Sequence, residues 1–366
     1  MAAANRKIQY AVVGLGHIAQ VAMIPAFKHA TRNSVLAAVV SGDRTKRDEI
    51  ARRYRVEAFD YDQFDDCLEI VDAVYIALPN SMHEEYTVRA ARAGVHVLCE
   101  KPLAVTVDEC RRMIAACRKA NVKLMTAYRL HLEPLTITAI ELARRGKLGE
   151  LKYFNSSFSM TVRQGDIRTK RDQGGGSLYD IGVYCINAAR NLFGAEPTQV
   201  SGISINSGVA RLSEIDETTA AILRFGDDRV ATFITSFNAA DVGSFRIVGT
   251  KGDLRADPAY EYAEALEYTV TIDGKKTKKK LPKHDHFGPQ LLYFSDCILK
   301  DRTPEPSGEE GLQDVRIVQA LYKSSQTGRP VNIPPFTDRK RPTRRQKITR
   351  PGIRKPRLVK VQSASE

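Results

Sequence analysis

No apolar run in the 366-residue sequence approaches the roughly 20 residues that a membrane-spanning helix needs. The opening residues, MAAANRK, contain neither the apolar segment of a secretory signal nor a twin-arginine export signal, so we expect a cytoplasmic protein. A hydrophobic content of 43% is that of a globular protein, and the length predicts two domains.

The six cysteines include no C-x-x-C pair. Each lies in an apolar or helical context, which favours reduced, buried thiols over disulfides or a zinc site. His284 and His286 are two apart in a Lys-rich loop without an obvious set of carboxylates and cysteines. We therefore predict no metal site.

The net charge of +13 is distributed unevenly along the chain. Residues 331–366 contain eleven Lys or Arg and two acidic residues, a net charge of +9 that leaves only +4 for the rest. From residue 334 onward the segment is rich in Pro, Arg and Lys and poor in large apolar groups, so we expect it to be disordered or weakly ordered. A solvated extension is the simplest interpretation, and contact with a polyanion is the alternative.

A glycine-rich turn near the start of the chain carries the first chemical signal. The apolar or small residues Tyr10–Gly14 suit a strand buried on both faces, and the sequence GLGHIA follows at once, before a helical pattern. Gly14 would permit the tight turn, Gly16 would let a pyrophosphate approach the backbone, and Ala19 would keep the helix close to the strand. This pattern predicts a dinucleotide site, with a purely structural turn as the alternative; the candidate cofactor-binding residues are Gly14, Gly16, His17 and Ile18.

The second strand, expected at Val35–Ser41, bears on the choice of dinucleotide. An NAD enzyme usually places an acid at its end to bind the ribose, whereas this chain has Ser41 followed by Gly42-Asp43-Arg44 and two further cations. A small hydroxyl followed by cations suits a 2′-phosphate and favours NADP, although Asp43 could bind a ribose if the strand ended later. An exposed helix face would also explain the cations. The candidate residues here are Ser41, Gly42, Arg44 and Lys46.

The apolar segment Ala73–Leu78 is predicted to be another parallel strand, followed by a helix over Ser81–Ala93. Residues at this strand end would lie at the edge of the sheet where ligands bind. Asn80 could contact the cofactor or only shape the turn, and His83 fits a first-turn helix residue better than a catalytic one. Four residues are assigned to the cofactor site here: Leu78, Pro79, Asn80 and His83.

The strand predicted at His96–Cys99 leads directly into Glu100-Lys101-Pro102. A lysine at the end of a buried strand, before a proline that restricts its backbone, would be held at the ligand edge; a surface lysine is the alternative. Units of strand and helix continue with short connections to Tyr128. This repetition predicts a doubly wound parallel sheet.

Beyond Leu130 the pattern changes to a helix over Glu133–Arg145 and then mainly to strands of alternating polarity, which suit an antiparallel sheet with one covered face. Between the first two strands lies Gly174-Gly175-Gly176, where the glycines would permit close approach to another backbone or a ligand. Asp180 and Tyr184 follow on one face of a predicted helix. A surface pair is the alternative to a functional one. A last helix is predicted over Leu312–Ser324.

Taken together, these segments resemble the glucose–fructose oxidoreductase, inositol dehydrogenase and rhizopine-catabolism (Gfo/Idh/MocA) superfamily, most closely its glucose–fructose oxidoreductase branch. The combination of E-K-P with D-I-G-x-Y is highly specific, and the likeness spans about residues 7–332. The segments that carry it are GLGHIA, AVYIALPN, HVLCEKPLAVT, GGGSLYDIGVYCINAAR and SGEEGLQDVRIVQALY.

The resemblance implies an α/β protein with a Rossmann domain over residues 1–129 and a C-terminal α/β domain over residues 130–333, whose open sheet is mostly antiparallel. Residues 334–366 lie outside it. Subunits of the superfamily often pair through the C-terminal sheet, so a homodimer or homotetramer is expected. Similarity to NADP-preferring members extends to Ser41 and the basic residues after it.

The same resemblance places Lys101 beside the nicotinamide and substrate, with Asp180 and Tyr184 in the same pocket. These three are the predicted catalytic and substrate residues, and in the sugar branch the tyrosine is the acid/base candidate. Tyr128 and Arg129 match a strand-end segment near the active site. Tyr128 is accordingly assigned to the substrate, and Arg129, Glu100 and Lys101 to the cofactor.

Sugar oxidation requires removal of the hydroxyl proton as hydride leaves for the nicotinamide. A free tyrosine, with a pKa near 10, is poorly matched to neutral pH, and the positive charges of Lys101 and the oxidised nicotinamide would favour the phenolate. On this hypothesis Tyr184 is the base, Lys101 tunes it and orients the substrate, and Asp180 accepts a hydrogen bond from a sugar hydroxyl.

We therefore expect an NADP-dependent oxidoreductase acting on an aldose or similar polyol. A keto-sugar reductase and a trans-dihydrodiol dehydrogenase are alternatives, and a non-catalytic NADP-sensing regulator is another, against which the presence of Lys101, Asp180 and Tyr184 argues. The periplasmic glucose–fructose oxidoreductase has a long N-terminal arm that helps to retain NADP, whereas about seven residues precede the first strand here. An ordinary dehydrogenase or reductase is thus favoured over a sugar–sugar oxidoreductase.

Overall fold

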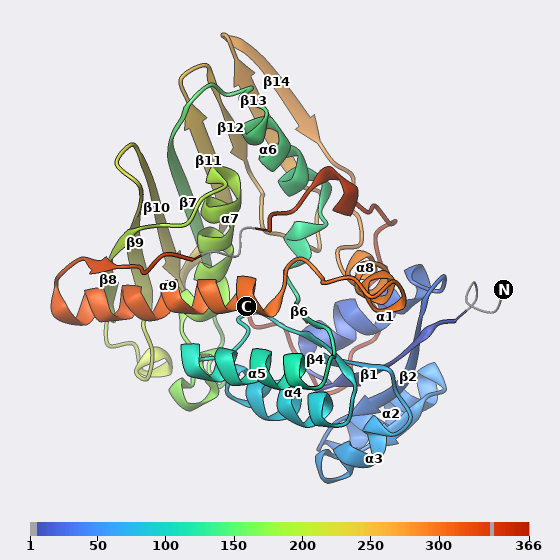
Figure 1. Cartoon of the computed structure of the whole chain (residues 1–366). Helices are drawn as coiled ribbons and strands as arrows, with labels where there is room; N and C mark the ends of the chain where they lie inside the picture. The colour runs from blue at the N-terminus through green and yellow to red at the C-terminus, as the bar shows by residue number, and fades with distance from the viewer. Residues whose placement is uncertain (1–5, 337–339, 366) are drawn as a thin grey trace.

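The computed structural model describes residues 6–336 and 340–365, which build two sheets with helices packed against them (Figure 1). The first sheet is parallel throughout, in the order β3-β2-β1-β4-β5-β6. This is the order of a Rossmann fold, which confirms the predicted doubly wound sheet. Its strands are β1 (Ile8–Val13), β2 (Ser34–Val40), β3 (Glu57–Phe59), β4 (Ala73–Ile76), β5 (His96–Cys99) and β6 (Leu124–Thr126).

Helices connect these strands with short loops. The first connection begins with a π-helical turn, Ala19–Met23, and the fourth strand is followed by a 3₁₀ turn, Asn80–Met82. Thr106 caps α5: its hydroxyl accepts a hydrogen bond from the backbone N–H of Glu109, and the Glu109 carboxylate accepts one from the backbone N–H of Thr106. The α-helices of this part are α1 (Ile24–Ala26), α2 (Arg44–Tyr54), α3 (Phe64–Leu68), α4 (His83–Arg92) and α5 (Val107–Lys119).

The second sheet has nine strands in the order β14-β13-β12-β11-β7-β10-β9-β8-β15. All its pairs are antiparallel except β7 with β10, which confirms the expected open, mostly antiparallel sheet. Its strands are β7 (Leu151–Thr161), β8 (Gln199–Ile205), β9 (Thr218–Phe225), β10 (Arg229–Ser236), β11 (Asn238–Gly249), β12 (Gly252–Ala256), β13 (Glu267–Ile272), β14 (Lys275–Lys280) and β15 (Val331–Asn332).

One face of this sheet is covered by helices, and the core lies between them. Apolar residues of α6, α7 and α9 pack there against inward-facing residues of the strands. The opposite face leaves large apolar side chains exposed, among them Ile203, Ile222 and Ile234. The helices are α6 (Pro134–Arg144), α7 (Val183–Phe193), α8 (Gly288–Leu299) and α9 (Gly308–Thr327).

One α-helix and three strands of the second half were not predicted, the short strand β15 among them. Helix α8 packs into the core of the Rossmann domain, where Leu291 and Phe294 join the cluster that contains Tyr10. Because α8 is buried on nearly all sides, its sequence lacks the one-sided apolar pattern that marks a surface helix. Strand β12 was not recognised within its loop. Strand β14 consists of Lys275–Lys280, all exposed, and forms because it pairs with β13 at the sheet edge rather than by burying apolar groups.

The C-terminal segment differs from the weakly ordered extension that its composition predicts. Residues 340–365 lie against the body of the protein, and Val359 is only 5% exposed. Val359, Ile348 and Ile353 pack with the apolar cluster that surrounds β1 and α8. Isolated apolar residues in a basic segment give little sequence signal, but each finds a site on the folded surface.

A buried charge network fastens α7 to α9. The guanidinium of Arg190, with no exposed surface, lies 2.7 Å from Glu196, 2.9 Å from Glu310 and 2.5 Å from Asp314. Arg341 of the C-terminal segment reaches Glu196 as well. Such a network depends on each member, because a carboxylate that loses its cation remains buried and uncompensated.

Replacing Arg190 with methionine should therefore lower the free energy of unfolding by about 3–5 kcal/mol. Arg224→Met is the matched control: this arginine pairs with Asp227 at 2.5 Å but is 53% exposed, and its loss should cost less than about 1 kcal/mol. Urea unfolding followed by circular dichroism measures both. Equal effects of the two substitutions would contradict the assigned importance of the network.

Candidate active site

The glycine-rich turn after β1 has the shape that a dinucleotide needs. Gly14 has φ +93°, and a Cβ there would lie 2.6 Å from the carbonyl oxygen of Ala77. A Cβ on Gly16 would meet nothing within 4 Å, so this side of the turn is open. The buried Nε2 of His17 has no hydrogen-bond partner among the described residues. A tight turn, open space in front of Gly16 and a spare polar atom fit a pyrophosphate.

At the end of β2, Asp43 takes part in local hydrogen bonds. Its carboxylate accepts from the backbone N–H of Lys46 at 3.0 Å and caps α2, which lowers the pKa of Asp43. Ser41 is buried, and its hydroxyl accepts from the backbone N–H of Asp43 at 3.3 Å. Gly42 and Arg44 are exposed beside it. Arg47 donates to the Asp60 carboxylate at 2.6 Å and to the Ser41 carbonyl at 3.5 Å.

The structure brings Lys101 and Asp180 together from the two domains. The Lys101 ammonium donates to the Asp180 carboxylate at 2.8 Å and to its backbone carbonyl at 2.7 Å. The other carboxylate oxygen accepts from Arg168 Nε at 2.7 Å. The side chains of Lys101 and Asp180 are only 11% and 14% exposed. Asp180 is thus held between two cations at the junction of the domains.

Electrostatics keeps this trio charged. Burial disfavours the charge of Asp180, but Arg168 and Lys101 outweigh it and hold the pKa of the carboxyl well below its usual range. Burial also opposes the charge of Lys101, and the adjacent Asp180 more than compensates, so the pKa of the ammonium is raised. Lys101 therefore remains a fixed positive charge at neutral pH.

Two cations lie near the ring of Tyr184. Lys101 Nζ lies 4.9 Å from the centre of its ring, and the guanidinium carbon of Arg129 lies 5.1 Å from it. Arg129 is held in place by the backbone carbonyl of Tyr260 and by His286 Nδ1 at 3.1 Å. The π-helical turn Leu178–Gly182 immediately precedes α7 and carries Asp180, so both predicted residues come from one irregular helix start.

Other predicted residues contribute to the walls of the site. Asn80 donates to the carbonyl of Gly174 at 2.8 Å and joins the loop after β4 to the triple glycine. A Cβ on Gly174 would lie 2.8 Å from that of Asn80, so glycine is required for the approach that the sequence predicts. Leu78 and Pro79 shape the loop beside Gly14. Glu100 is buried, which raises its pKa, and it accepts a hydrogen bond from the Tyr75 hydroxyl.

Two predicted residues are buried within the fold. His83 has no exposed surface, and its ring nitrogens lie 3.0 Å from the carbonyls of Pro102 and Leu78, so it ties together the loops after β5 and β4. Tyr128 is 2% exposed and stacks on His131 with ring centres 5.5 Å apart. The direct ligand contacts expected of both residues stay predictions.

Arg168 is the principal residue that sequence reasoning missed. It lies in the basic loop before the triple glycine, on the 3₁₀ turn Ile167–Thr169, where Asp166 accepts from its guanidinium at 3.2 Å. In the sequence it is one of several exposed-looking cations, and only the fold shows that it contacts Asp180. The position of Asp166 two residues earlier was the available local signal.

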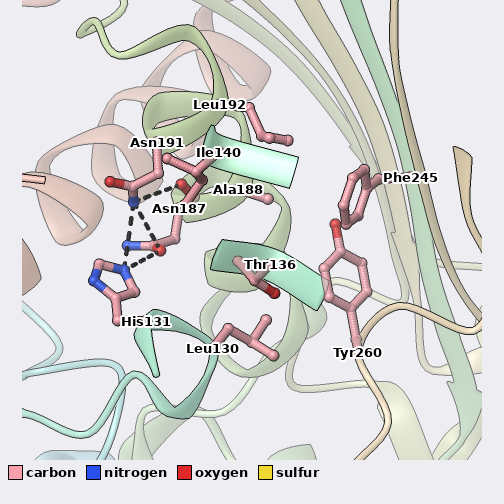
Figure 2. A pocket seen from close by; sticks show the side chains of 10 residues that line it. All are labelled: Leu130, His131, Thr136, Ile140, Asn187, Ala188, Asn191, Leu192, Phe245 and Tyr260. Carbon is pink, nitrogen blue, oxygen red and sulfur yellow. Dashed lines mark hydrogen bonds between the residues drawn. The ribbon is translucent and has the colours of Figure 1, made fainter. Parts of the chain in front are cut away.

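Figure 2 shows a separate pocket inside the C-terminal domain, between α6, α7 and the sheet. Three of its polar side chains form hydrogen bonds with one another: His131 Nε2 lies 2.6 Å from Asn187 Oδ1, to which Asn191 also donates. Lys101, Asp180 and Tyr184 do not line it.

Among residues 6–336 and 340–365 no group of three His, Cys, Asp or Glu side chains could hold a metal ion, and no helix of that part is long and apolar enough to cross a membrane. All six cysteines are free and buried.

Two family models match the chain. The oxidoreductase family with an NAD-binding Rossmann fold matches residues 8–128, and the C-terminal α/β domain of the same oxidoreductase family matches residues 140–333. Together they cover the two sheets and end before the C-terminal segment.

Several known proteins are similar over both domains. An NADP⁺-dependent D-xylose 1-dehydrogenase from Haloferax volcanii is 30% identical over 332 residues, which cover 89% of this chain and 100% of that protein. The crystal structure of aldose-aldose oxidoreductase from Caulobacter crescentus with glycerol has a TM-score of 0.86 and 36% identity, covering 90% of this chain and all of that one. A 3-ketoreductase from Actinomadura kijaniata, in complex with NADP and TDP-benzene, has a TM-score of 0.79 and 27% identity, with 87% and 98% coverage.

Proposed function

The chain belongs to the Gfo/Idh/MocA oxidoreductase family, and from that premise we propose that it transfers a hydride between NADP and a hydroxyl or carbonyl carbon of an aldose or related polyol. The observation that carries the proposal is the contact of Lys101 with Asp180, beside the Tyr184 ring. Three polar groups converge there from both domains, at the carboxyl edge of the Rossmann sheet where ligands of such folds bind.

NADP is favoured over NAD by the end of β2. The Asp43 carboxylate is engaged in capping α2, while Ser41, Arg44 and Lys46, which follow β2 directly, would receive a 2′-phosphate. The glycine turn with His17 and Ile18 would hold the pyrophosphate. NADP in the names of the xylose dehydrogenase and ketoreductase relatives points the same way.

The bound nicotinamide supplies the acceptor for hydride in oxidation and its donor in reduction. Tyr184 takes the proton from the reacting hydroxyl, and returns it in the reverse direction. Lys101, fixed by Asp180 and Arg168, keeps a positive charge beside this tyrosine and orients the reacting oxygen. The guanidinium of Arg129 is a second positive charge near the Tyr184 ring. Asp180 primarily anchors Lys101 and offers its remaining acceptor capacity to a sugar hydroxyl.

Aldose oxidation is the leading reaction because the xylose dehydrogenase and the aldose-aldose oxidoreductase, both at least 30% identical, are named for aldoses. Reduction of a keto-sugar is the second candidate, supported by the ketoreductase relative. The trans-1,2-dihydrobenzene-1,2-diol dehydrogenase from Xenopus laevis is 30% identical over 213 residues, so dihydrodiols are tested as the alternative substrates.

The test is a steady-state comparison of aldoses with NADP⁺ and NAD⁺, and of keto-sugars with NADPH. We expect an aldose to reduce NADP⁺ with a higher kcat/KM than any dihydrodiol, and NADP⁺ to be preferred over NAD⁺. Activity confined to dihydrodiols would contradict the substrate class, and preference for NAD⁺ would contradict the assignment of Ser41, Arg44 and Lys46.

Self-association through the nine-stranded sheet is part of the proposal. Its uncovered face exposes Ile203, Ile222 and Ile234 at 68%, 50% and 51%, on the neighbouring strands β8, β9 and β10. A contiguous apolar face of this kind is typical of an interface between protein molecules.

Light scattering should therefore report a dimer or tetramer for the unaltered protein. The double substitution Ile222→Lys and Ile234→Lys should lower the molecular mass towards that of a monomer, because both charges would be buried at the interface. An unchanged assembly would place the contact elsewhere on the molecule.

A further inference from the structure

The C-terminal residues 353–365, here named the strap, cross between the two domains. The Val359 backbone N–H donates to Gln20 Oε1 at 2.8 Å, and Gln20 Nε2 donates to the carbonyls of Val359 and Leu15 at 3.0 and 2.9 Å. One glutamine thus links the strap to the glycine-rich turn itself. The buried Val359 side chain fixes this anchor to the Rossmann domain.

Two further anchors lie at the ends of the proposed cofactor site. Lys360 Nζ is 3.0 Å from Thr45 Oγ1 and 3.6 Å from Asp43 Oδ1, beside the end of β2. Farther along, the Ala364 carbonyl accepts from the backbone N–H of Arg163 at 2.9 Å, and Ser365 forms a β-bridge with Val162. Arg163 begins the loop that carries Arg168 to Asp180.

The segment from Lys360 to Ser365 therefore runs from the ribose end of the site to the substrate domain. Five residue steps can span at most about 17 Å. The three anchor points belong to the glycine-rich turn, the 2′-phosphate position and the border of the Lys101–Asp180 cluster. A dinucleotide extended between these points would lie beneath the strap.

Charge on the strap suits an anionic ligand. Burial lowers the pKa of His17, and the nearby cations Arg168 and Lys355 of the strap lower it further. Lys355 and Lys360 of the strap add their positive charges to those of the cations at the end of β2. Cations gathered around an open glycine turn and an unpartnered His17 Nε2 are the arrangement that a phosphate would neutralise.

We propose that the strap is the outer wall of the NADP site and that it retains the cofactor, which can leave only after the strap detaches from Arg163. This inference rests on the proposed NADP site but concerns residues beyond the matched family domains. The strap's Rossmann anchor is buried, whereas Gln362 is exposed and Ser365 only half-buried, so opening breaks the domain-bridging contacts alone. Those are the backbone bond, the β-bridge and the Arg163 side-chain bonds to Ser365 and Gln362 at 3.1 and 2.9 Å.

A reversible cross-link tests the proposal in the full chain. Val162→Cys and Ser365→Cys would place two thiols on residues paired across an antiparallel bridge, a separation that a disulfide can close. The protein is loaded with radiolabelled NADP⁺, oxidised to form the disulfide, and then mixed with excess unlabelled NADP⁺. The dissociation rate of the label is compared with that of the same variant reduced by a thiol, and with Ser365→Cys alone.

Oxidation should slow NADP⁺ release at least about tenfold, and reduction should restore the original rate. Arg163→Ala, which removes two of the strap's side-chain contacts, should accelerate release without any cross-link. Equal release from the oxidised and reduced forms would overturn the proposal, as would binding of NADP⁺ only after the strap is freed, since the strap would then obstruct the site. Failure of NADP⁺ to bind either form, or the unaltered chain, would instead contradict the proposed cofactor.

Discussion

Replacing Tyr184 with phenylalanine should lower kcat by about a hundred- to ten-thousand-fold, because the substitution removes the group that accepts the substrate proton. The aromatic ring remains, so the contacts with Lys101 and Arg129, at 4.9 and 5.1 Å from its centre, are retained. The dissociation constant of NADP⁺, measured by fluorescence titration, should therefore be unchanged. Loss of turnover with intact cofactor binding would locate the defect in proton transfer.

Tyr153→Phe is the control for this experiment. Tyr153 is 44% exposed on the outer face of the nine-stranded sheet, away from the proposed site, and its hydroxyl has no assigned role in the reaction. Its substitution should leave kcat unchanged. Normal turnover by Tyr184→Phe would remove Tyr184 as the acid/base and redirect attention to Lys101, the other proton-bearing group of the cluster.

Lys101→Met is expected to have the second large effect on activity. The substitution removes the cation that contacts both Asp180 and the Tyr184 ring and leaves Asp180 with Arg168 alone. Loss of charge stabilisation at a reacting group typically costs about a hundred- to a thousand-fold in kcat.

Comparing kcat with the fraction of folded protein separates this role from a merely structural one. Lys101→Arg keeps the charge but replaces a compact ammonium with a planar fork, so it should recover only part of the kcat that Lys101→Met loses. Lys279→Met, on the exposed strand β14, provides a lysine control that should change neither quantity. A loss of activity in proportion to the loss of folded protein would assign Lys101 to stability alone.

Much of the site was predictable because its parts follow directly from strand ends. GLGHIA comes immediately after β1, Asn80 after β4 and Lys101 after β5, and parallel strands bring their carboxyl ends to one edge. Helical spacing also predicted that Asp180 and Tyr184 share one helix face. The direct contact of Asp180 with Lys101 has no local signal in the sequence, because the two residues lie in different domains and meet only when the domains pack together.

The parts that escaped prediction depend on long-range contacts. Arg168 and the exposed cations around it have the same local sequence character, and only the loop's path selects one for Asp180. His83 appears at the start of a helix near the ligand edge, but three-dimensional packing buries it against two backbone carbonyls. The strap lacks a periodic pattern altogether, and single residues such as Val359 acquire their positions from a surface already folded.

The most direct test of the central claim is a single-turnover experiment in which protein in excess over NADP⁺ is mixed with an aldose deuterated at the carbon to be oxidised. The absorbance of reduced nicotinamide should rise more slowly than with the undeuterated sugar, and Tyr184→Phe should abolish the rise while still binding NADP⁺. This result would join hydride transfer to the Lys101–Asp180–Tyr184 site. Formation of reduced nicotinamide at an undiminished rate in Tyr184→Phe, or none from any aldose with the unaltered protein, would contradict it.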